Sequence, residues 1–333
     1  MKKSLLALAV LGAFAGAAHA QTSVTIYGAM DVGLTKSTGS TTAVNAGDNN
    51  KLGFRGTEDL GGGLSALFQA EIRFDPNTGK SEGNGNRPLF QGSSVVGLSG
   101  GFGTLRLGRA LSPMQATMPA YDAWGATRNR ATFVPGIALA TYNSNPLEPL
   151  GTMNRFSNGI FYTTPNMNGL QAQFAFQTKQ AQDAGTPASA AFSTAATYAN
   201  GPLAASLTYE RNAIRDKFWG LGASYKMGTF TLMGTYANAD NSTIAVPAAV
   251  AGVRARDAKA WTVSGKAAVG SGNFLVGYGT LNPNGGNNDT NQLSAGYEHN
   301  LSKRTFLYTD IKRSKTDGRK AVNTFDVGVH HNF

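Results

Sequence analysis

Side chains capable of covalent or metal chemistry are few in this sequence. The chain has no cysteine, which excludes a thiol nucleophile, a thiolate metal site and a disulfide framework. After the first twenty residues its histidines are His299, His330 and His331. The last two are adjacent in an alternating pattern, so they point to opposite faces and cannot easily bind one metal ion. With no P-loop or G-x-S-x-G motif, we expect no catalytic site, metal or cofactor.

Positive charge at alternating positions is the stronger chemical signal. In "KLGFRG" the leucine and phenylalanine take one face, so the lysine and arginine take the other. The same face of this segment, of "GLSALFQAEIRF" and of "GTLRLGR" carries these charged side chains: Lys51, Arg55, Glu71, Arg73 and Arg106. An excess of fixed positive charge beside a narrow water-filled space lowers the energy of anions and raises that of cations. The chemistry indicated is therefore electrostatic selection of small ions.

The segments that carry these residues have a period of two along almost the whole chain. In "SVTIYGAMDVGLT" large apolar residues alternate with threonine, tyrosine and aspartate. The segments "GLSALFQAEIRF", "LQAQFAFQTK" and "AWTVSGKAAV" repeat the pattern. Successive side chains of a β-strand point to opposite faces, so each segment predicts a strand with one apolar and one polar face.

Short and long connections alternate between these strands. Seven are short and marked by glycine or asparagine, such as "YANGP" and "VGSGN", and permit tight hairpins. Eight others are mostly longer and polar, at about 36–50, 75–90, 110–157, 179–191, 211–217, 238–258, 282–291 and 313–322. Fifteen connections join sixteen strands. Tight turns at one end and long loops at the other are typical of an antiparallel transmembrane β-barrel with periplasmic turns and external loops. A soluble sandwich or propeller is the alternative, but it would need apolar inward faces.

The first twenty residues read as an export signal. "MKKSLLALAVLGAFAGAAHA" has Lys2 and Lys3, an apolar run and a final Ala-His-Ala, the order of a cleavable signal peptide. An N-terminal core helix is the alternative. We expect residues 1–20 to be removed and residues 21–333 to form one barrel domain. Removing two lysines from 29 basic residues leaves 27 against 19 acidic ones, a net charge of +8.

The C-terminal "FDVGVHHNF" carries the strand pattern to the last residue, whereas most domains end in a loose polar tail. A last strand that closes the barrel against the first cannot fray. We therefore expect Phe325, Val327, Val329 and Phe333 to face lipid, with Phe333 in the periplasmic aromatic girdle.

Six segments together resemble the general porins of neisserial and burkholderial Gram-negative bacteria: "SVTIYGAMDVGL", "LGFRGTEDLGGGLSALFQAE", "VVGLSGGFGTLRLGR", "FYTTPNMNGLQAQFAF", "LSKRTFLY" and "VGVHHNF". The resemblance runs from Ser23 to Phe333. It implies a homotrimeric outer-membrane channel of sixteen strands that passes small hydrophilic solutes and ions, set in outer-membrane lipid and lipopolysaccharide. It further implies that Phe333 is the signal read by the barrel-assembly machinery.

The resemblance also implies how the lumen is arranged. In the family the third external loop folds into the lumen, narrows the pore and faces a basic cluster on the wall. Lys51 occupies a position often held by arginine, and Gly92 stands where a further family arginine would be. The arginine cluster is therefore incomplete in this sequence.

The segment 110–157 is the longest connection, at 48 residues. Its aromatic, methionine and proline content indicates a packed loop, folded into the lumen or, alternatively, lying as a surface flap. It holds the acids Asp122 and Glu148 and the bases Arg128, Arg130 and Arg155. We expect Arg128 and Arg130 to add to the positive side of the constriction, with Asp122 as counter-charge.

These observations predict a diffusion channel that favours small inorganic and organic anions. A substrate-specific anion or phosphate-type channel on the same barrel is the main alternative, which a saturable conductance would reveal. An outer-membrane barrel enzyme is a remote one, because it would need a serine or aspartate placed against a histidine, and His299 lies beside the turn "HNLSKR". The basic residues are spread along the barrel without a compact patch, so we expect no nucleic-acid partner.

Overall fold

The structure is a computed structural model. It describes residues 23–47, 50–83, 85–125, 131–139, 142–144, 154–178, 189–241, 257–283 and 288–333. The expected signal peptide, residues 1–20, lies outside the described residues. Among the residues described, no helix combines the length and the apolar character required to cross a membrane.

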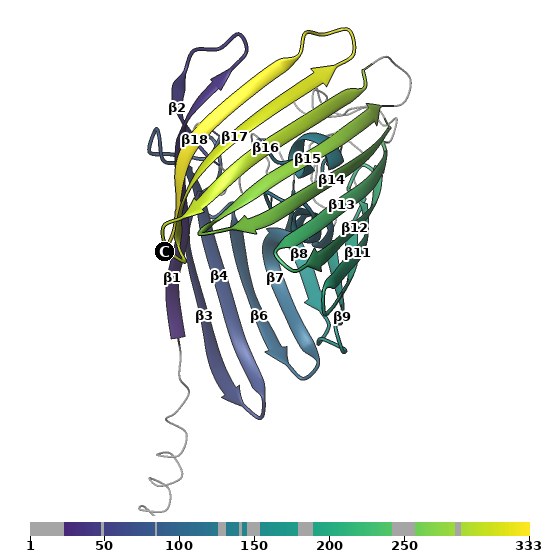
Figure 1. The fold of residues 1–333 in the computed structure, drawn as a ribbon. Helices are drawn as coiled ribbons and strands as arrows, with labels where there is room; N and C mark the ends of the chain where they lie inside the picture. Colours follow the sequence, from purple (N-terminus) through teal and green to yellow (C-terminus); the bar gives the residue numbers. More distant parts are fainter. Residues whose placement is uncertain are drawn as a thin grey trace, which may run out of the picture.

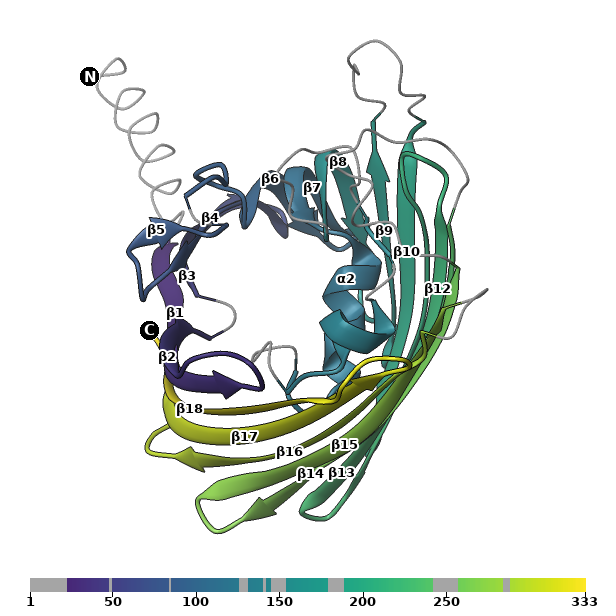
Figure 2. The same cartoon turned by 90° about the horizontal axis from the view of Figure 1, so that it is seen from above.

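Sixteen long antiparallel strands of the described chain close into one barrel (Figures 1 and 2). Each pairs with the next, and β18 pairs with β1, which confirms the predicted fold class. Two short strands lie within long connections. β2 (Ala43–Ala46) pairs with β1, and β5 (Lys80–Ser81) pairs with the end of β4. The long strands are β1 (Ser23–Ser37), β3 (Lys51–Gly61), β4 (Leu64–Asp75), β6 (Ser93–Gly100), β7 (Gly103–Leu111), β8 (Arg155–Thr163), β9 (Leu170–Gln177), β10 (Ala191–Asn200), β11 (Leu203–Arg211), β12 (Lys217–Met227), β13 (Phe230–Asp240), β14 (Ala258–Val269), β15 (Gly272–Pro283), β16 (Thr290–Asn300), β17 (Thr305–Thr316) and β18 (Val322–Asn332).

The connections alternate as the sequence predicted. Single pairs of residues join β10 to β11, β12 to β13 and β14 to β15. In these turns Gly201, Gly228 and Gly270 have φ of 56° to 59°, a left-handed conformation that costs glycine little. At the other end the longest connection covers residues 112–154 rather than 110–157, because β7 continues to Leu111 and β8 begins at Arg155.

The barrel closes through the last residue of the chain. Residues 29–37 of β1 pair with residues 324–332 of β18. Beyond that ladder the amide of Phe333 donates to the carbonyl of Gly28 at 3.1 Å, and the amide of Gly28 donates back at 3.0 Å. On the inner side of the same seam Asp31, which is fully buried, accepts a hydrogen bond from the Tyr308 hydroxyl at 2.7 Å. The closing strand is therefore held by backbone and side-chain bonds.

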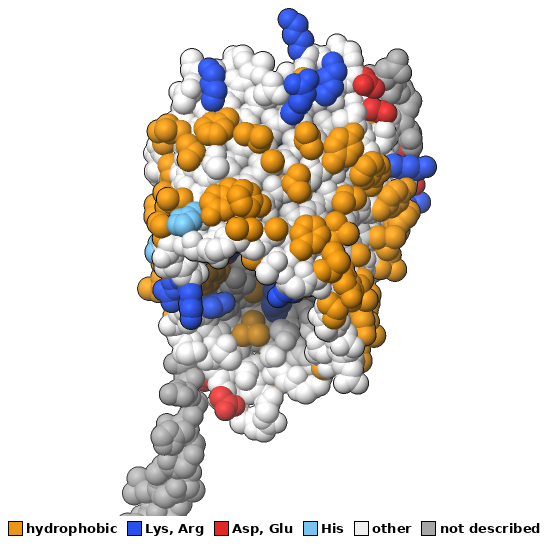
Figure 3. Space-filling view, viewed as in Figure 1, with side chains coloured by type: hydrophobic (Ala, Val, Ile, Leu, Met, Phe, Trp, Pro, Cys, Tyr) orange, Lys and Arg blue, Asp and Glu red, His pale blue; other side chains and the backbone are white. Residues whose placement is uncertain are grey.

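The outer surface carries a belt of hydrophobic side chains, with most Lys and Arg side chains above or below it on the face shown (Figure 3). The four residues of the last strand that the sequence assigned to lipid are exposed on this surface: Phe325, Val327, Val329 and Phe333. Near the long-connection end, aromatic side chains pair across strands, as Trp219 does with Tyr236 at 5.2 Å between ring centroids. So many exposed apolar side chains would be unfavourable in water. They match the apolar band and aromatic girdle of a membrane barrel.

Candidate functional site in the barrel lumen

The described parts of the connection between β7 and β8 lie inside the barrel (Figure 2). They form α2 (Pro113–Thr117), the 3₁₀ turn η1 (Met118–Tyr121) and the π-type turn η2 (Val134–Ala138). These turns pack on the inner wall from β10 to β15. This part of the chain takes the inward course expected from the sequence, not that of a surface flap.

Glycines on the inner wall make room for the aromatic side chains of this loop. A Cβ atom on Gly222 of β12 would lie 2.2 Å from Cδ2 of Tyr121. A Cβ atom on Gly277 of β15 would lie 2.7 Å from Cε2 of Phe133. Both separations are far below van der Waals contact, so the rings reach the strand backbones only because these positions lack side chains. The tyrosine and phenylalanine are thereby seated at fixed points of the wall.

The wall beneath the loop differs from the sequence expectation in one respect. The expected polar face was to line water all round the lumen. From β12 to β15 the inner face instead packs with the loop in a hydrophobic cluster that includes Trp124, Phe133, Ile137, Phe218, Ala237, Ala260 and Leu275. The alternation of side chains along each strand identified which residues point inward, but it could not show that the loop covers them.

Asp122 organises the loop from within. Its side chain is 2% exposed. One oxygen accepts from the amide of Trp124 at 3.0 Å. The other accepts from the amides of Phe133 at 2.7 Å and Val134 at 3.1 Å, and from the Thr132 hydroxyl. A carboxylate with several donors is a strong local anchor, and the structure places it inside the loop rather than on the lumen surface.

Polar contacts tie the loop to β11, β14, β16 and β17. The indole of Trp124 donates to Asp310 of β17 at 2.9 Å. The amide of Ala123 donates to the Ser264 hydroxyl of β14 at 3.0 Å. The Gln292 amide of β16 donates to the carbonyls of residues 131 and 132, each at 3.0 Å. Ser112, the N-cap of α2, donates to the buried Glu210 of β11. The loop is thus hydrogen-bonded to one side of the barrel at several points.

Tyr142 shows that the loop side of the lumen is shielded from water. Its ring packs on Phe218 at 5.3 Å between centroids, and its hydroxyl donates to the carbonyl of Asp216 at 3.4 Å. Burial, with smaller contributions from the charges of Glu210 and Asp216, raises the pKa of Tyr142 well above its ordinary value. The phenol therefore stays neutral at any physiological pH.

The opposite side of the lumen carries the cationic residues that the sequence singled out. Lys51 and Arg55 lie on β3, and Lys51 approaches Glu71 of β4 with 3.9 Å between Nζ and Oε2. The Arg55 guanidinium lies over the ring of Tyr27, 5.1 Å from its centroid, within cation–π range. The Tyr27 hydroxyl in turn donates to Glu71 at 3.1 Å and accepts from Gln69 at 2.6 Å.

Arg73 on β4 and Arg106 on β7 continue this wall in one direction from β3. Arg73 lies directly across from Lys51 in the β3–β4 ladder and approaches Glu82 at 3.7 Å. Arg106 of β7 lies across from Gly97, where a Cβ atom would be 3.0 Å from the arginine stem. Its guanidinium is 5.7 Å from the ring centroid of Phe161.

Another arginine bonds to the backbone at Gly92. Arg155, the first residue of β8, is 4% exposed and donates from Nε to the carbonyl of Gly92 at 2.6 Å. A Cβ atom on Gly92 would lie 2.6 Å from a carboxylate oxygen of Glu71, so a side chain there would displace Glu71. Sequence reasoning counted Arg155 among the loop charges but did not assign it to the wall. Its position directly after the longest loop was the only available signal.

We refer to Lys51, Arg55, Arg73, Arg106 and Arg155, with the acids Glu71 and Glu82 between them, as the basic wall. The predicted residues Lys51, Arg55, Glu71, Arg73 and Arg106 all belong to it. Arg128 and Arg130 lie outside the described residues. The part that each residue plays in a constriction stays a prediction.

The histidines contribute no metal site in the described part of the chain. His330 points inward, with Nδ1 3.2 Å from Asp31, whereas His331 is exposed and contacts the Thr305 hydroxyl at 2.8 Å. Among the described residues, no group of three His, Cys, Asp or Glu side chains could hold a metal ion.

Comparison with known proteins gives consistent results. A family model described as Gram-negative porin matches residues 7–319. The outer membrane porin protein 32 of Delftia acidovorans is 34% identical over 363 residues, covering 99% of this chain and 95% of that protein. The major outer membrane protein P.IB of Neisseria lactamica is 27% identical, and the match covers 100% of both chains.

Solved structures show the same fold. An anion-selective porin from Comamonas acidovorans aligns with a TM-score of 0.78 and 26% identity, covering 94% of this chain and 100% of that one. The Vibrio cholerae protein OmpT, at 14% identity and a TM-score of 0.68, shares the fold.

Proposed function

The chain belongs to the Gram-negative porin family, and we propose that it is an anion-favouring channel in which the basic wall selects the passing ions. It is a porin of the Gram-negative outer membrane, and small hydrophilic solutes and ions cross it by passive diffusion. The observation that carries the proposed selectivity is the excess of cations over carboxylates on the basic wall. The anion selectivity of the related Comamonas porin supports it.

The wall residues act to different extents because their surroundings differ. Arg55 is exposed and lies over the neutral ring of Tyr27. Lys51 is only 24% exposed and lies close to Glu71, which offsets part of its charge. Arg155 is buried against a carbonyl and acts through its charge rather than by contact. Arg55 is therefore the cation that an anion meets most directly.

Passage requires that this attraction stay weak. An anion beside the wall exchanges part of its hydration shell for arginine and lysine donors, and it must leave again within its transit. Glu71 and Glu82 serve this purpose by limiting the net positive charge. The inserted loop forms the other boundary of the passage, to which we propose that Arg128 and Arg130 add positive charge. Asp122, buried in the loop, would act on ions at a distance.

Several related roles belong to the same proposal. We propose that residues 1–20 are a cleaved signal peptide, that residues 21–333 form the barrel domain, and that the channel is a homotrimer. We propose that the barrel-assembly machinery reads Phe333, whose backbone bonds to Gly28 support a role in closure. The related proteins are channels rather than enzymes, and we propose that this chain has no enzymatic activity.

The test is the reversal potential of single channels in a potassium chloride gradient across a planar bilayer. We expect the sign that reports chloride passing more readily than potassium, with current that rises linearly with salt. A potassium-favouring sign would refute the proposed selectivity. Saturation of the current by millimolar phosphate would instead favour the substrate-specific channel.

A further inference from the structure

Two arginines of the basic wall have aromatic rings as their neighbours rather than carboxylates. The Arg55 guanidinium lies over the ring of Tyr27, 5.1 Å from its centroid, and that of Arg106 lies over the ring of Phe161 at 5.7 Å. Neither guanidinium has a hydrogen bond or an ion pair with another described residue. The N–H donors that each arginine carries are therefore left to the water and solutes of the lumen.

The other cations of the basic wall differ in this respect. Lys51 and Arg73 each approach a carboxylate, at 3.9 Å and 3.7 Å, and Arg155 donates to a backbone carbonyl at 2.6 Å. Acceptors of the protein thus occupy part of their capacity to bind an anion. Within the described wall, Arg55 and Arg106 are the two whose donors all remain available to a passing solute.

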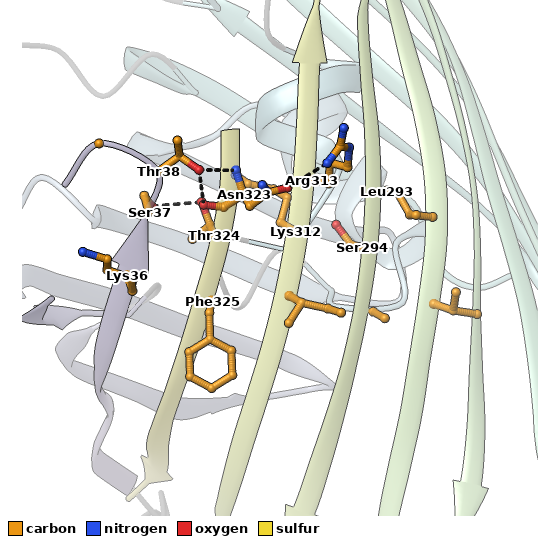
Figure 4. Close-up of a pocket in the computed structure, with 14 residues that line it drawn as sticks. Lys36, Ser37, Thr38, Leu293, Ser294, Lys312, Arg313, Asn323, Thr324 and Phe325 are labelled. Carbon is orange, nitrogen blue, oxygen red and sulfur yellow. Dashed lines mark hydrogen bonds between the residues drawn. The ribbon is translucent and has the colours of Figure 1, made fainter. Parts of the chain in front are cut away.

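The outer wall shows a different arrangement of the same residue types. In the groove lined by β1 and β15–β18, Arg313 donates to the Asn323 side chain at 3.4 Å and lies apart from the ring of Phe325 (Figure 4). This arginine is held by an amide and not by a ring. The presence of arginines and aromatic residues on neighbouring strands therefore does not by itself produce an arginine–ring pair.

Glycines let the two rings of the basic wall lie close to the strands. Tyr27 lies across from Gly53 in the β1–β3 ladder, and a Cβ atom on Gly53 would be 2.3 Å from the ring. A Cβ atom on Gly159 of β8 would be 2.6 Å from the ring of Phe161. Because one side of each ring lies against a strand, the side toward the lumen is left for the guanidinium. From the strand toward the lumen the order is backbone, ring, guanidinium and water.

The two arginine–ring pairs lie at separate points of the wall. Arg106 is in one row with Gly97, Leu67 and Thr57 of the neighbouring strands, so it lies two residues nearer the tight turns than Arg55 does. β3 and β7 are three strand spacings apart, or roughly 14 Å. A small solute would therefore meet the two pairs in succession, and neither needs to hold it strongly.

We propose that these two pairs make the channel favour planar aromatic carboxylates over saturated carboxylates of the same charge and size. The proposal rests on the anion-favouring function proposed above. One guanidinium can donate two parallel N–H bonds to a carboxylate. It is also planar and stacks on aromatic faces, so a flat ring attached to the carboxylate gains a contact that a puckered saturated ring cannot make. Chloride, which has no such face, is attracted by the charge alone.

The test compares benzoate with cyclohexanecarboxylate, which has the same charge and nearly the same size but a saturated ring. Potassium benzoate bathes one side of a planar bilayer that holds the purified full-length channel, and potassium cyclohexanecarboxylate bathes the other, at neutral pH. The reversal potential then reports the ratio of the two permeabilities. We expect wild type to favour benzoate by about two- to fivefold, the factor that one exposed cation–π contact represents.

The decisive variant is Arg55→Lys/Arg106→Lys, which keeps both charges but removes both planar groups. Its benzoate preference should fall close to one, while its reversal potential in a potassium chloride gradient keeps the chloride-favouring sign. Tyr27→Leu removes one ring without changing charge and should lower the preference in part. The matched control is Arg211→Lys. Arg211 lies over Phe192, 5.5 Å from the ring centroid, but on the outward face of β11, since the adjacent Glu210 points inward; this variant should keep the wild-type preference.

Three results would overturn the proposal: equal permeabilities in wild type, an undiminished benzoate preference in the double variant, or an equal fall in Arg211→Lys. A chloride-favouring channel with equal benzoate and cyclohexanecarboxylate permeabilities would refute this inference alone. A potassium-favouring sign in the potassium chloride gradient would instead refute the proposed function, so the two failures are distinguishable.

Discussion

Reversing the charge of Arg55 should move the channel toward cations more than reversing that of Lys51. Arg55 is exposed and contacts a neutral ring, so Arg55→Glu changes the field that an ion meets by two full charges. Lys51→Glu would place a second carboxylate next to Glu71, which now lies 3.9 Å from the lysine. Lys51 is only 24% exposed, and Glu71 already offsets part of its charge, so an ion meets this position less directly. The effective change at position 51 is therefore smaller.

The size of the effect follows from distance and screening. For an ion about 6 Å from the side-chain charge, the interaction is about 0.7 kcal/mol per unit charge in water, and a Debye length of about 8 Å at physiological salt reduces it to about 0.3 kcal/mol. Two charges acting oppositely on anion and cation then change their relative free energies by about 1.3 kcal/mol, or roughly tenfold in the permeability ratio. At 1 M salt the Debye length is about 3 Å, and the change falls to about twofold.

The measurement is the reversal potential of each variant in matched salt gradients at low and high mean concentration. Lys259→Glu is the control, because it makes the same change of charge on the outer surface. The reasoning fails if Arg55→Glu leaves the low-salt reversal potential where it is, or if the shift does not shrink as salt rises. A larger shift from Lys51→Glu than from Arg55→Glu would contradict the ranking by exposure.

The remaining predictions concern the loop, the wall and the seam. Gly222→Val should displace Tyr121 at a cost of about 1–3 kcal/mol to the seated loop, seen as noisier and altered single-channel conductance, whereas Gly234→Ala, with its nearest atom at 3.2 Å, should conduct as wild type. Arg155→Met should shift the reversal potential toward cations by less than Arg55→Glu does, and an equal or opposite shift would exclude it from the wall. Deleting Phe333 should slow assembly into the outer membrane far more than it alters conductance, and normal insertion rates, followed by the heat-dependent shift in gel mobility, would reject this.

The barrel itself was predictable because its causes are local. Alternation assigns each side chain to a face, and glycine-marked turns fix where strands reverse, so residues such as Ile26, Arg55 and Arg106 could be placed by counting. The loop between β7 and β8 could be recognised as packed from its composition. The place where the loop packs on the wall could not be predicted, because Gly222 and Gly277 look like ordinary strand glycines until the rings that cover them are known.

Two charged residues near the loop show what the alternation of side chains along a strand cannot predict. Asp122 looked like a free acid in a polar connection, but its neighbours in space are the amides of Phe133 and Val134, more than ten residues away in sequence. Arg155 looked like one more loop cation, but β8 begins at that residue and carries it to Gly92. Both outcomes depend on contacts between residues that are distant in sequence. The alternating pattern of a strand does not predict such contacts.

The division of the lumen into a packed side and a charged side has a consequence for how such channels diverge. The loop side is close-packed, so most substitutions there cost stability and are removed by selection. Apart from the buried Arg155 and Glu71, the basic wall consists of long, partly hydrated side chains whose ion pairs contribute little to folding. Selectivity can therefore drift from one descendant to another by single substitutions on β3, β4 and β7, while the aperture is inherited almost unchanged. On this reasoning, ion preference changes with fewer substitutions than pore size does.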